Sequence, residues 1–189
     1  MFYLITGVIL WSALHFMPAI PAGIRSKLIK RTDLVVYKGV FALVIVLAVL
    51  LMVMGWKATP RVFAFQPPAW GVTVNLVFML ATSVLLLAPY LENNFKRILR
   101  HPQLIGFVLW GAGHVLATGQ VRSLVLFGGL GVWAFVEMLL INRRDGPWQK
   151  PKPVSALADF RLLLAGMGFF ILFMFTHLRL FGVSPVPTW

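Results

Sequence analysis

Residues 40–56 of the chain read VFALVIVLAVLLMVMGW, an unbroken apolar run without a charged side chain. About 20 largely apolar residues are enough for a helix to cross the hydrocarbon core of a bilayer. Similar apolar blocks recur along the whole chain, and they are too continuous for helices with only one apolar face. The sequence therefore predicts an all-α fold, a polytopic bundle of membrane-spanning helices.

The composition agrees with this prediction. Of 189 residues, 60% are hydrophobic and 12% are charged, whereas soluble domains carry about 25% charged residues. The net charge is +12, but the basic residues lie in short connections between apolar blocks, so we expect no nucleic-acid partner. The chain has no cysteine, which excludes disulfides, thiolate ligands, iron–sulfur clusters and covalently attached c-type haem. A bound metal or haem would have to use His, Met or carboxylate ligands.

Six spans are predicted within a single transmembrane domain covering residues 1–189. They are placed at 2–20, 35–56, 71–90, 103–118, 121–141 and 160–182. The fourth span is short, and we expect it to begin in the preceding turn at 94–100, because Pro102 is tolerated in the first turn of a helix.

The basic residues predict the orientation of the spans. The first, third and fifth connections and their borders carry 13 of the 17 Lys and Arg residues. Connections rich in Lys and Arg remain on the cytoplasmic side of a membrane. We therefore expect a multi-pass protein of the bacterial inner (cytoplasmic) membrane, with both termini in the periplasm.

Two segments of the chain have matching sequences. Residues 7–15 read GVILWSALH and residues 106–114 read GFVLWGAGH, so that Gly, Leu, Trp, Ala and His coincide. The two spans that hold them run in opposite directions. A true duplication would make the protein a three-plus-three inverted repeat with a site at the repeat interface. The alternative is coincidence, since no convincing match links the other spans.

The two histidines of these segments are the main candidate site. An imidazole buried in hydrocarbon is costly and is usually retained for function. We expect His15 and His114 to be the axial ligands of one haem b, with Trp11, Trp110 and Gly111 beside the macrocycle. Bis-imidazole ligation needs only two residues, whereas structural zinc needs four. The alternative is that both histidines are packing residues bonded to a neighbouring Ser, Thr or carbonyl group.

Few other polar residues fall within the spans. His101 lies at the entrance of the fourth span, where a helix N-terminus attracts anions and polar groups, and His177 is expected at the membrane interface. Glu137 is expected to form an ion pair with one of the arginines at 143–144. The alternative for Glu137 is a proton donor or a partner for a propionate-binding arginine. The glycine run at 128–131 is expected to be a close-packing site.

Several short motifs lie between residues 100 and 146: RHPQ at 100–103, GVW at 131–133 and NRRDG at 142–146, together with Gly106, Trp110 and His114. In these motifs the chain resembles the NnrU family of bacterial membrane proteins, a family linked to nitrite and nitric oxide reduction. That family is similar to zeta-carotene isomerase, a membrane enzyme that binds haem b through histidines. The resemblance implies that Arg100, His101 and Gln103 belong to the cofactor site. It also maps the two ligand histidines of the isomerase onto His114 and His15.

One position departs from the isomerase pattern. The isomerase has a cysteine three residues before the histidine of its fourth helix, where this chain has Gly111. Haem binding can carry over, but a ligand switch that depends on that cysteine cannot. The RHP motif is also shared with isoprenylcysteine carboxyl methyltransferases, but those enzymes have Tyr in place of Gln103 and a downstream Glu-Glu pair, which this chain lacks.

Three functional hypotheses follow. The first is a membrane b-type haem protein, bis-His ligated, that acts in nitric oxide and nitrite metabolism (denitrification) or in redox handling. The second is a haem-dependent cis–trans isomerase of a carotenoid or another lipid. The third is a non-catalytic assembly factor for a reductase. The expected partners are accordingly the lipid bilayer, a small gas or lipid substrate, and a reductase complex.

Overall fold

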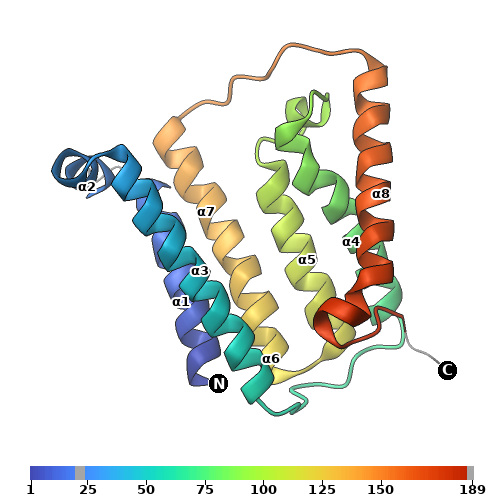
Figure 1. Ribbon diagram of the computed structural model, residues 1–189. Coiled ribbons are helices and arrows are strands. Elements are labelled where there is room, and N and C mark those ends of the chain that lie inside the picture. The colour runs from blue at the N-terminus through green and yellow to red at the C-terminus, as the bar shows by residue number, and fades with distance from the viewer. Residues whose placement is uncertain (20–23, 187–189) are drawn as a thin grey trace.

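The computed structural model describes residues 1–19 and 24–186 of the chain (Figure 1). Its long helices are α1 (Phe2–Ala19), α3 (Leu34–Ala58), α4 (Gly71–Leu87), α5 (Pro102–Thr118), α7 (Gly129–Asp145) and α8 (Ala156–Phe181). The short elements are α2 (Ile24–Thr32), α6 (Val121–Ser123), the 3-10 turns η1 (Ala88–Tyr90) and η2 (Phe95–Arg97), and the π-helical turn η3 (Leu124–Gly128). The prediction of an all-α helical bundle is confirmed.

Five segments of the described chain are long and apolar enough to cross a bilayer, namely 2–19, 34–58, 71–90, 121–145 and 156–181. The fourth of these is continuous, because α6, η3 and α7 follow one another without a break. Helix α5 has 17 residues, a length of about 26 Å at the helical rise, so the count of six spans is not confirmed. The predicted bounds otherwise agree to within a few residues, and residue 20, the predicted end of the first span, lies outside the described residues.

The predicted start of the fourth span is wrong. Helix α5 begins at Pro102, and the preceding His101 has φ −128° and ψ 64°, outside the helical region. The ring of a proline clashes with a helical conformation of the residue before it. The turn at 94–100 therefore cannot continue into α5, and it forms the separate turn η2 instead.

The long helices pack in a single row. In the described chain the extensive contacts join α3 to α1, α1 to α7, α7 to α5, α5 to α4 and α4 to α8. In the predicted inverted repeat, α1 would correspond to α5 and α4 to α8. The close contact between α4 and α5 would then have a counterpart between α8 and α1. Helix α8 instead packs against α4, at the other end of the row from α1. The order of packing therefore does not follow the repeat.

Glycines allow the helices of the row to approach closely. A Cβ atom at Gly111 of α5 would lie 2.5 Å from the Phe127 carbonyl oxygen, and one at Gly129 would lie 2.9 Å from a methyl of Val8. Small residues at such positions let helix backbones come together in a membrane. The prediction of close packing in the 128–131 run is confirmed at Gly129.

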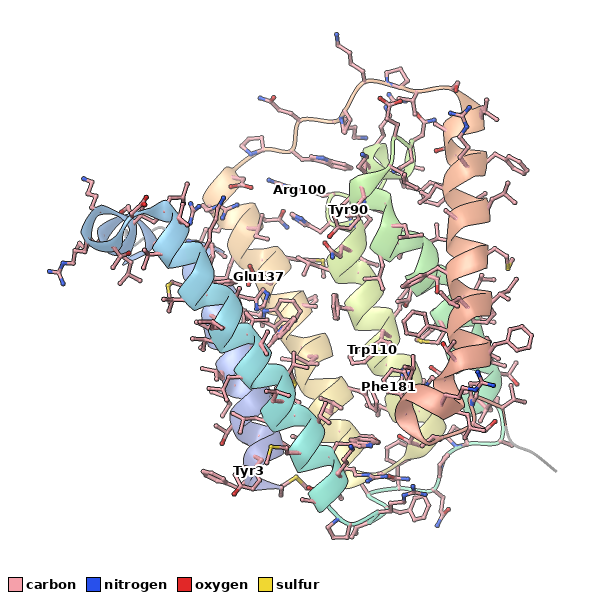
Figure 2. All side chains as sticks on the ribbon, in the orientation of Figure 1. Tyr3, Tyr90, Arg100, Trp110, Glu137 and Phe181 are labelled. Carbon is pink, nitrogen blue, oxygen red and sulfur yellow. The ribbon has the colours of Figure 1, made fainter. Side chains whose placement is uncertain are left out.

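The two ends of the row differ in charge. One end, which we call the basic end, holds α2, residues 88–101 and residues 146–155, the three connections that carry most of the basic side chains (upper part of Figure 1). At the opposite end, the 59–70 loop pairs with the turn after α5, where Ala64 donates to the Gly119 carbonyl at 2.8 Å. Figure 2 shows Arg100 toward the basic end and Tyr3 toward the opposite end.

Candidate functional site

A cavity of about 620 Å³ lies at the basic end, between α1, α5, α7 and the 146–155 loop. Five of the predicted site residues line it: Trp11, His15, Arg100, His101 and Gln103. The wall also includes apolar and aromatic side chains, among them Leu104, Phe107 and Trp133. A mostly apolar hollow of this size with a few polar groups is typical of a small-molecule or cofactor site.

Among the described residues, one ring nitrogen of His15 has no hydrogen-bond partner. Its Nδ1 lies 2.9 Å from the Trp11 carbonyl oxygen, four residues back on α1. A carbonyl only accepts, so Nδ1 carries the proton and Nε2 keeps its lone pair. The ring stacks on Trp11 at 4.3 Å between centroids and meets the edge of Trp133 at 5.0 Å. The imidazole is thus fixed in orientation with a free ligand atom, as in metal-binding histidines whose other nitrogen donates to a carbonyl.

His114 makes the same local bond in different surroundings. Its Nδ1 lies 2.9 Å from the Trp110 carbonyl oxygen, so its tautomer matches that of His15. The ring stacks on Phe127, with centroids 4.4 Å apart. His114 and Trp110 do not line the cavity at the basic end, and Gly111 lines a separate apolar pocket of about 330 Å³ between α5 and α7.

The two imidazoles lie at different depths in the row. His15 is four residues from the end of α1 at the basic end, whereas His114 is twelve residues from the start of α5 at that end. These offsets correspond to about 6 Å and 18 Å along the helix axes. Ring contacts in the described chain connect the two histidines only by way of Trp133, Phe107 and Trp110. The structure therefore does not bring the two rings to one cavity.

Two residues of the RHPQ motif tie the 146–155 loop and the end of α7 to the start of α5. Arg100 donates through Nη1 to the Gly146 carbonyl at 2.8 Å, and His101 Nε2 lies 2.9 Å from Asn142 Oδ1. If the amide oxygen accepts from Nε2, the Nδ1 atom of His101 keeps its lone pair. His101 is therefore a second imidazole at the cavity with a nitrogen available.

Three buried polar atoms of the cavity wall have no hydrogen-bond partner in the described chain: the indole Nε1 of Trp11, the indole Nε1 of Trp133 and Oε2 of Glu137. Trp133 and Glu137 are 5% and 7% exposed. Leaving such an atom unpaired costs about 1–3 kcal/mol. Three such residues, Trp11, Trp133 and Glu137, line the same cavity, although the unpaired atoms themselves are buried.

The expected ion pair of Glu137 is not formed. Within the described residues, Arg144 pairs with Asp145 at 2.7 Å, and Glu137 lies within salt-bridge distance of no basic group. Asp145 adjoins Arg144 in sequence, so the pair forms at little conformational cost. Glu137 instead lines the cavity, and its buried Oε2 atom has no hydrogen-bond partner in the described chain.

Three residues of the cavity wall, Trp133, Glu137 and Lys96, are not among the site residues predicted from the sequence. Trp133 belongs to the GVW motif, but its place at the cavity depends on the contact between α1 and α7. Glu137 was recognised as a carboxyl within a span, and that signal alone could have placed it in the site. Lys96, which also lines the cavity, lies in a basic turn and gave no signal in the sequence.

No group of three or more His, Asp or Glu side chains in the described part of the chain is arranged to hold a metal ion. His177, in the last turns of α8, is bonded through Nδ1 to the Val183 carbonyl at 2.7 Å.

Comparison with known proteins gives one match. The sequence model of the family described as NnrU protein matches residues 3–185. No curated protein and no solved structure matches the chain. Because the family match covers nearly the whole length, the chain belongs to the NnrU protein family.

Proposed function

We propose that this NnrU-family membrane protein binds a b-type haem in the cavity at the basic end, with His15 as an axial ligand. The observation that carries the proposal is the His15 ring, which lines a cavity of about 620 Å³ and whose Nδ1 is bonded to the Trp11 carbonyl, while its Nε2 has no hydrogen-bond partner among the described residues. The haem would supply an iron that exchanges electrons or binds a small gas. Such an iron suits the nitric oxide and nitrite metabolism or redox handling that the family resemblance implies.

The rest of the cavity wall fits this cofactor. Leu104, Phe107 and Trp133 provide apolar surface for a flat macrocycle. Lys96 and Arg100 line the same cavity and provide cations for two propionates.

The second axial ligand is either His114 or His101. Pairing of His15 with His114 stays a prediction, and it requires the two rings to approach past Trp133, Phe107 and Trp110. His101 already lines the cavity with His15. The arrangement of the cavity therefore favours His101 as the partner of His15, with Asn142 holding its orientation.

The test is the visible spectrum of the protein purified in detergent, before and after haem supplementation. We expect a Soret band in the wild type that His15→Ala abolishes, that His101→Ala weakens or shifts, and that His114→Ala leaves in place. His177→Ala is the matched control. If His114→Ala loses the Soret band and His101→Ala keeps it unchanged, the predicted pairing of His15 with His114 would be supported. A wild-type protein without a Soret band after supplementation would refute haem binding altogether.

A second candidate, isomerisation of a polyene or another lipid, is favoured by the apolar pocket between α5 and α7. That pocket of about 330 Å³ is lined by glycines and aliphatic side chains, with almost no polar surface. Incubation of the reduced protein with cis polyene isomers tests this activity by chromatography of the products. Conversion that depends on both haem and His15 would support it.

A third candidate is an assembly factor for a reductase. Copurification with reductase subunits, unchanged by substitution of His15 and His114, would support that role and make the histidines structural.

The orientation is also proposed. We place the basic end in the cytoplasm of a bacterial inner membrane, with α1 beginning and α8 ending on the periplasmic side, because 13 of the 17 basic residues lie at or near the basic end. Labelling of single cysteines is well suited to this test, since the chain has no native cysteine. A cysteine at Lys150 should react only in opened vesicles, and a cysteine at Arg61 should react in intact cells.

A further inference from the structure

Helix α2 (Ile24–Thr32) stands apart from the row of spanning helices, between the end of α1 and the start of α3. Figure 1 shows it projecting sideways at the basic end. None of its described side chains is fully buried, and Lys27, Lys30 and Arg31 are exposed. A nine-residue helix has little stability of its own in water. Within the described residues, protein packing covers little of α2.

Three basic residues of α2 share one exposed face. Lys27, Lys30 and Arg31 are spaced three and four residues apart, so they lie on the same side of the helix. Leu28, which is 38% exposed, lies at the edge of this face, next to Arg31. The opposite side is not apolar, because Arg25 lies between Leu28 and Ile29 around the helix. The exposed basic face is therefore the feature that suits α2 to an anionic membrane surface.

The basic face of α2 has no acidic partner. In the described chain Lys27, Lys30 and Arg31 make no ion pair, since the salt bridge found there joins Arg144 to Asp145. The nearest acid in sequence, Asp33, accepts a hydrogen bond from the backbone N–H of Leu34 and caps α3. Three cations on one face thus remain without a counter-charge from the protein.

The turn at Asp33 sets the depth and direction of α2. Asp33 has φ 82°, and its N–H donates to the Ile29 carbonyl at 2.9 Å, so the chain bends sharply between α2 and α3. The Arg25 guanidinium lies 6.0 Å from the centre of the Tyr37 ring, a further link between the two helices. Val35, in the first turn of α3, is 74% exposed, as expected for a side chain in lipid. Helix α2 therefore lies at the level of the lipid headgroups.

We propose that α2 is a binding site for acidic phospholipids, with the face formed by Lys27, Lys30 and Arg31 paired to headgroup phosphates and Leu28 in the acyl boundary. Long basic side chains reach phosphates while their stems cover apolar surface. Each basic residue near an anionic surface contributes about a fivefold preference, so three contribute on the order of a hundredfold. This site is independent of the haem proposal.

The test uses the full chain in lipid nanodiscs of stated composition. Because the chain has no cysteine, a Leu28→Cys variant carries a single polarity-sensitive fluorophore. In discs of phosphatidylcholine alone we expect a water-exposed emission. Replacing part of that lipid with phosphatidylglycerol should shift the emission to the blue and expose the fluorophore to lipid-borne quenchers, and high salt should reverse both changes.

The charge dependence decides the proposal. Lys27→Glu, Lys30→Glu and Arg31→Glu together, in the Leu28→Cys background, should abolish the response to phosphatidylglycerol. Lys150→Glu, Lys152→Glu and Arg161→Glu together change the net charge by the same amount and should preserve it. A fluorophore that remains exposed in every lipid mixture would overturn the proposal and leave α2 free for an acidic protein. An equal response of both triple variants would overturn it as well, since the effect would then follow net charge alone.

Discussion

The two matching segments, residues 7–15 and 106–114, show how one sequence pattern acquires two different environments. In both segments the histidine Nδ1 bonds the carbonyl of the tryptophan four residues earlier, at 2.9 Å in each case. This bond is local, and one turn of helix is enough to form it. The partners beyond that turn differ. His15 stacks on its own tryptophan beside an open cavity, whereas His114 stacks on Phe127 of the adjacent η3 turn. The sequence pattern thus determines the tautomer of each histidine, whereas the neighbouring helices determine the surroundings of its Nε2 atom.

The largest difference expected between the two segments is in the rescue of haem binding by added imidazole. His15→Gly should lower haem content roughly a hundredfold, and millimolar imidazole should restore it, because the free base can enter the cavity that His15 lines. His114→Gly should retain its haem and show no response to imidazole. The measurement is Soret absorbance per protein at increasing imidazole. Equal rescue of both variants would show that the two histidines serve the same site.

A second difference lies in the residue before each histidine, Leu14 in one segment and Gly113 in the other. A Cβ at Gly113 would lie 2.5 Å from Asn75 Oδ1 and 3.3 Å from its Cα. Gly113→Leu, which makes the second segment resemble the first, should therefore cost roughly 3 kcal/mol through overpacking. The free energy of unfolding in mixed micelles measures this cost. Gly168→Leu is the matched control, because nothing lies within 4 Å of a Cβ at that position, and equal losses in the two variants would contradict the packing argument.

A smaller effect is expected two residues earlier, at Ser12 in one segment and Gly111 in the other. Gly111→Ser would place a Cβ against the Phe127 carbonyl and should cost about 1–3 kcal/mol of unfolding free energy. The reverse change, Ser12→Gly, removes the Ser12 hydroxyl bond to the Val8 carbonyl and should cost about 1 kcal/mol, chiefly through the helix propensity of glycine. The same unfolding measurement compares them. A larger loss in Ser12→Gly than in Gly111→Ser would contradict the close approach of α5 and η3.

The smallest expected effect concerns the two tryptophans. The Trp11 indole N–H has no partner in the described chain, so Trp11→Phe should change the unfolding free energy of the haem-free protein by less than about 1 kcal/mol. The same variant should weaken haem binding several-fold, because the cavity loses a donor, whereas Trp110→Phe should not. Haem titration followed by absorbance measures both. A haem affinity that Trp11→Phe leaves unchanged would exclude this indole from the site.

Much of the fold could be predicted from the sequence, because long apolar blocks have few alternatives in a membrane. The bounds of the helices follow those blocks, and the exceptions have local causes. Pro102 keeps the preceding residue out of the helix and delays the start of α5. The sequence predicts the polar segment 24–32 as a connection, because four basic residues among nine hide the helical period of so short an element.

The site could be predicted only in part. The sequence singled out Trp11, His15, Arg100, His101 and Gln103, and all five line the cavity. The pairing of His15 with His114 stays a prediction, and the sequence pattern contains no information about the depth of the two rings along antiparallel helices. Trp133 and Glu137 enter the cavity through the packing of α7 against α1 and α5, and the order of helices in the row cannot be derived from the separate spans.

The single row of helices affects how a nonpolar solute can reach the protein. A row has no enclosed helix, so only one layer of side chains separates its interior from the surrounding acyl chains. A nonpolar solute dissolved in those chains, such as a diatomic gas or a long polyene, therefore needs no aqueous route to reach the helices. Its supply would depend on its solubility in lipid and on the fluidity of the bilayer, and much less on its concentration in the cytoplasm or periplasm.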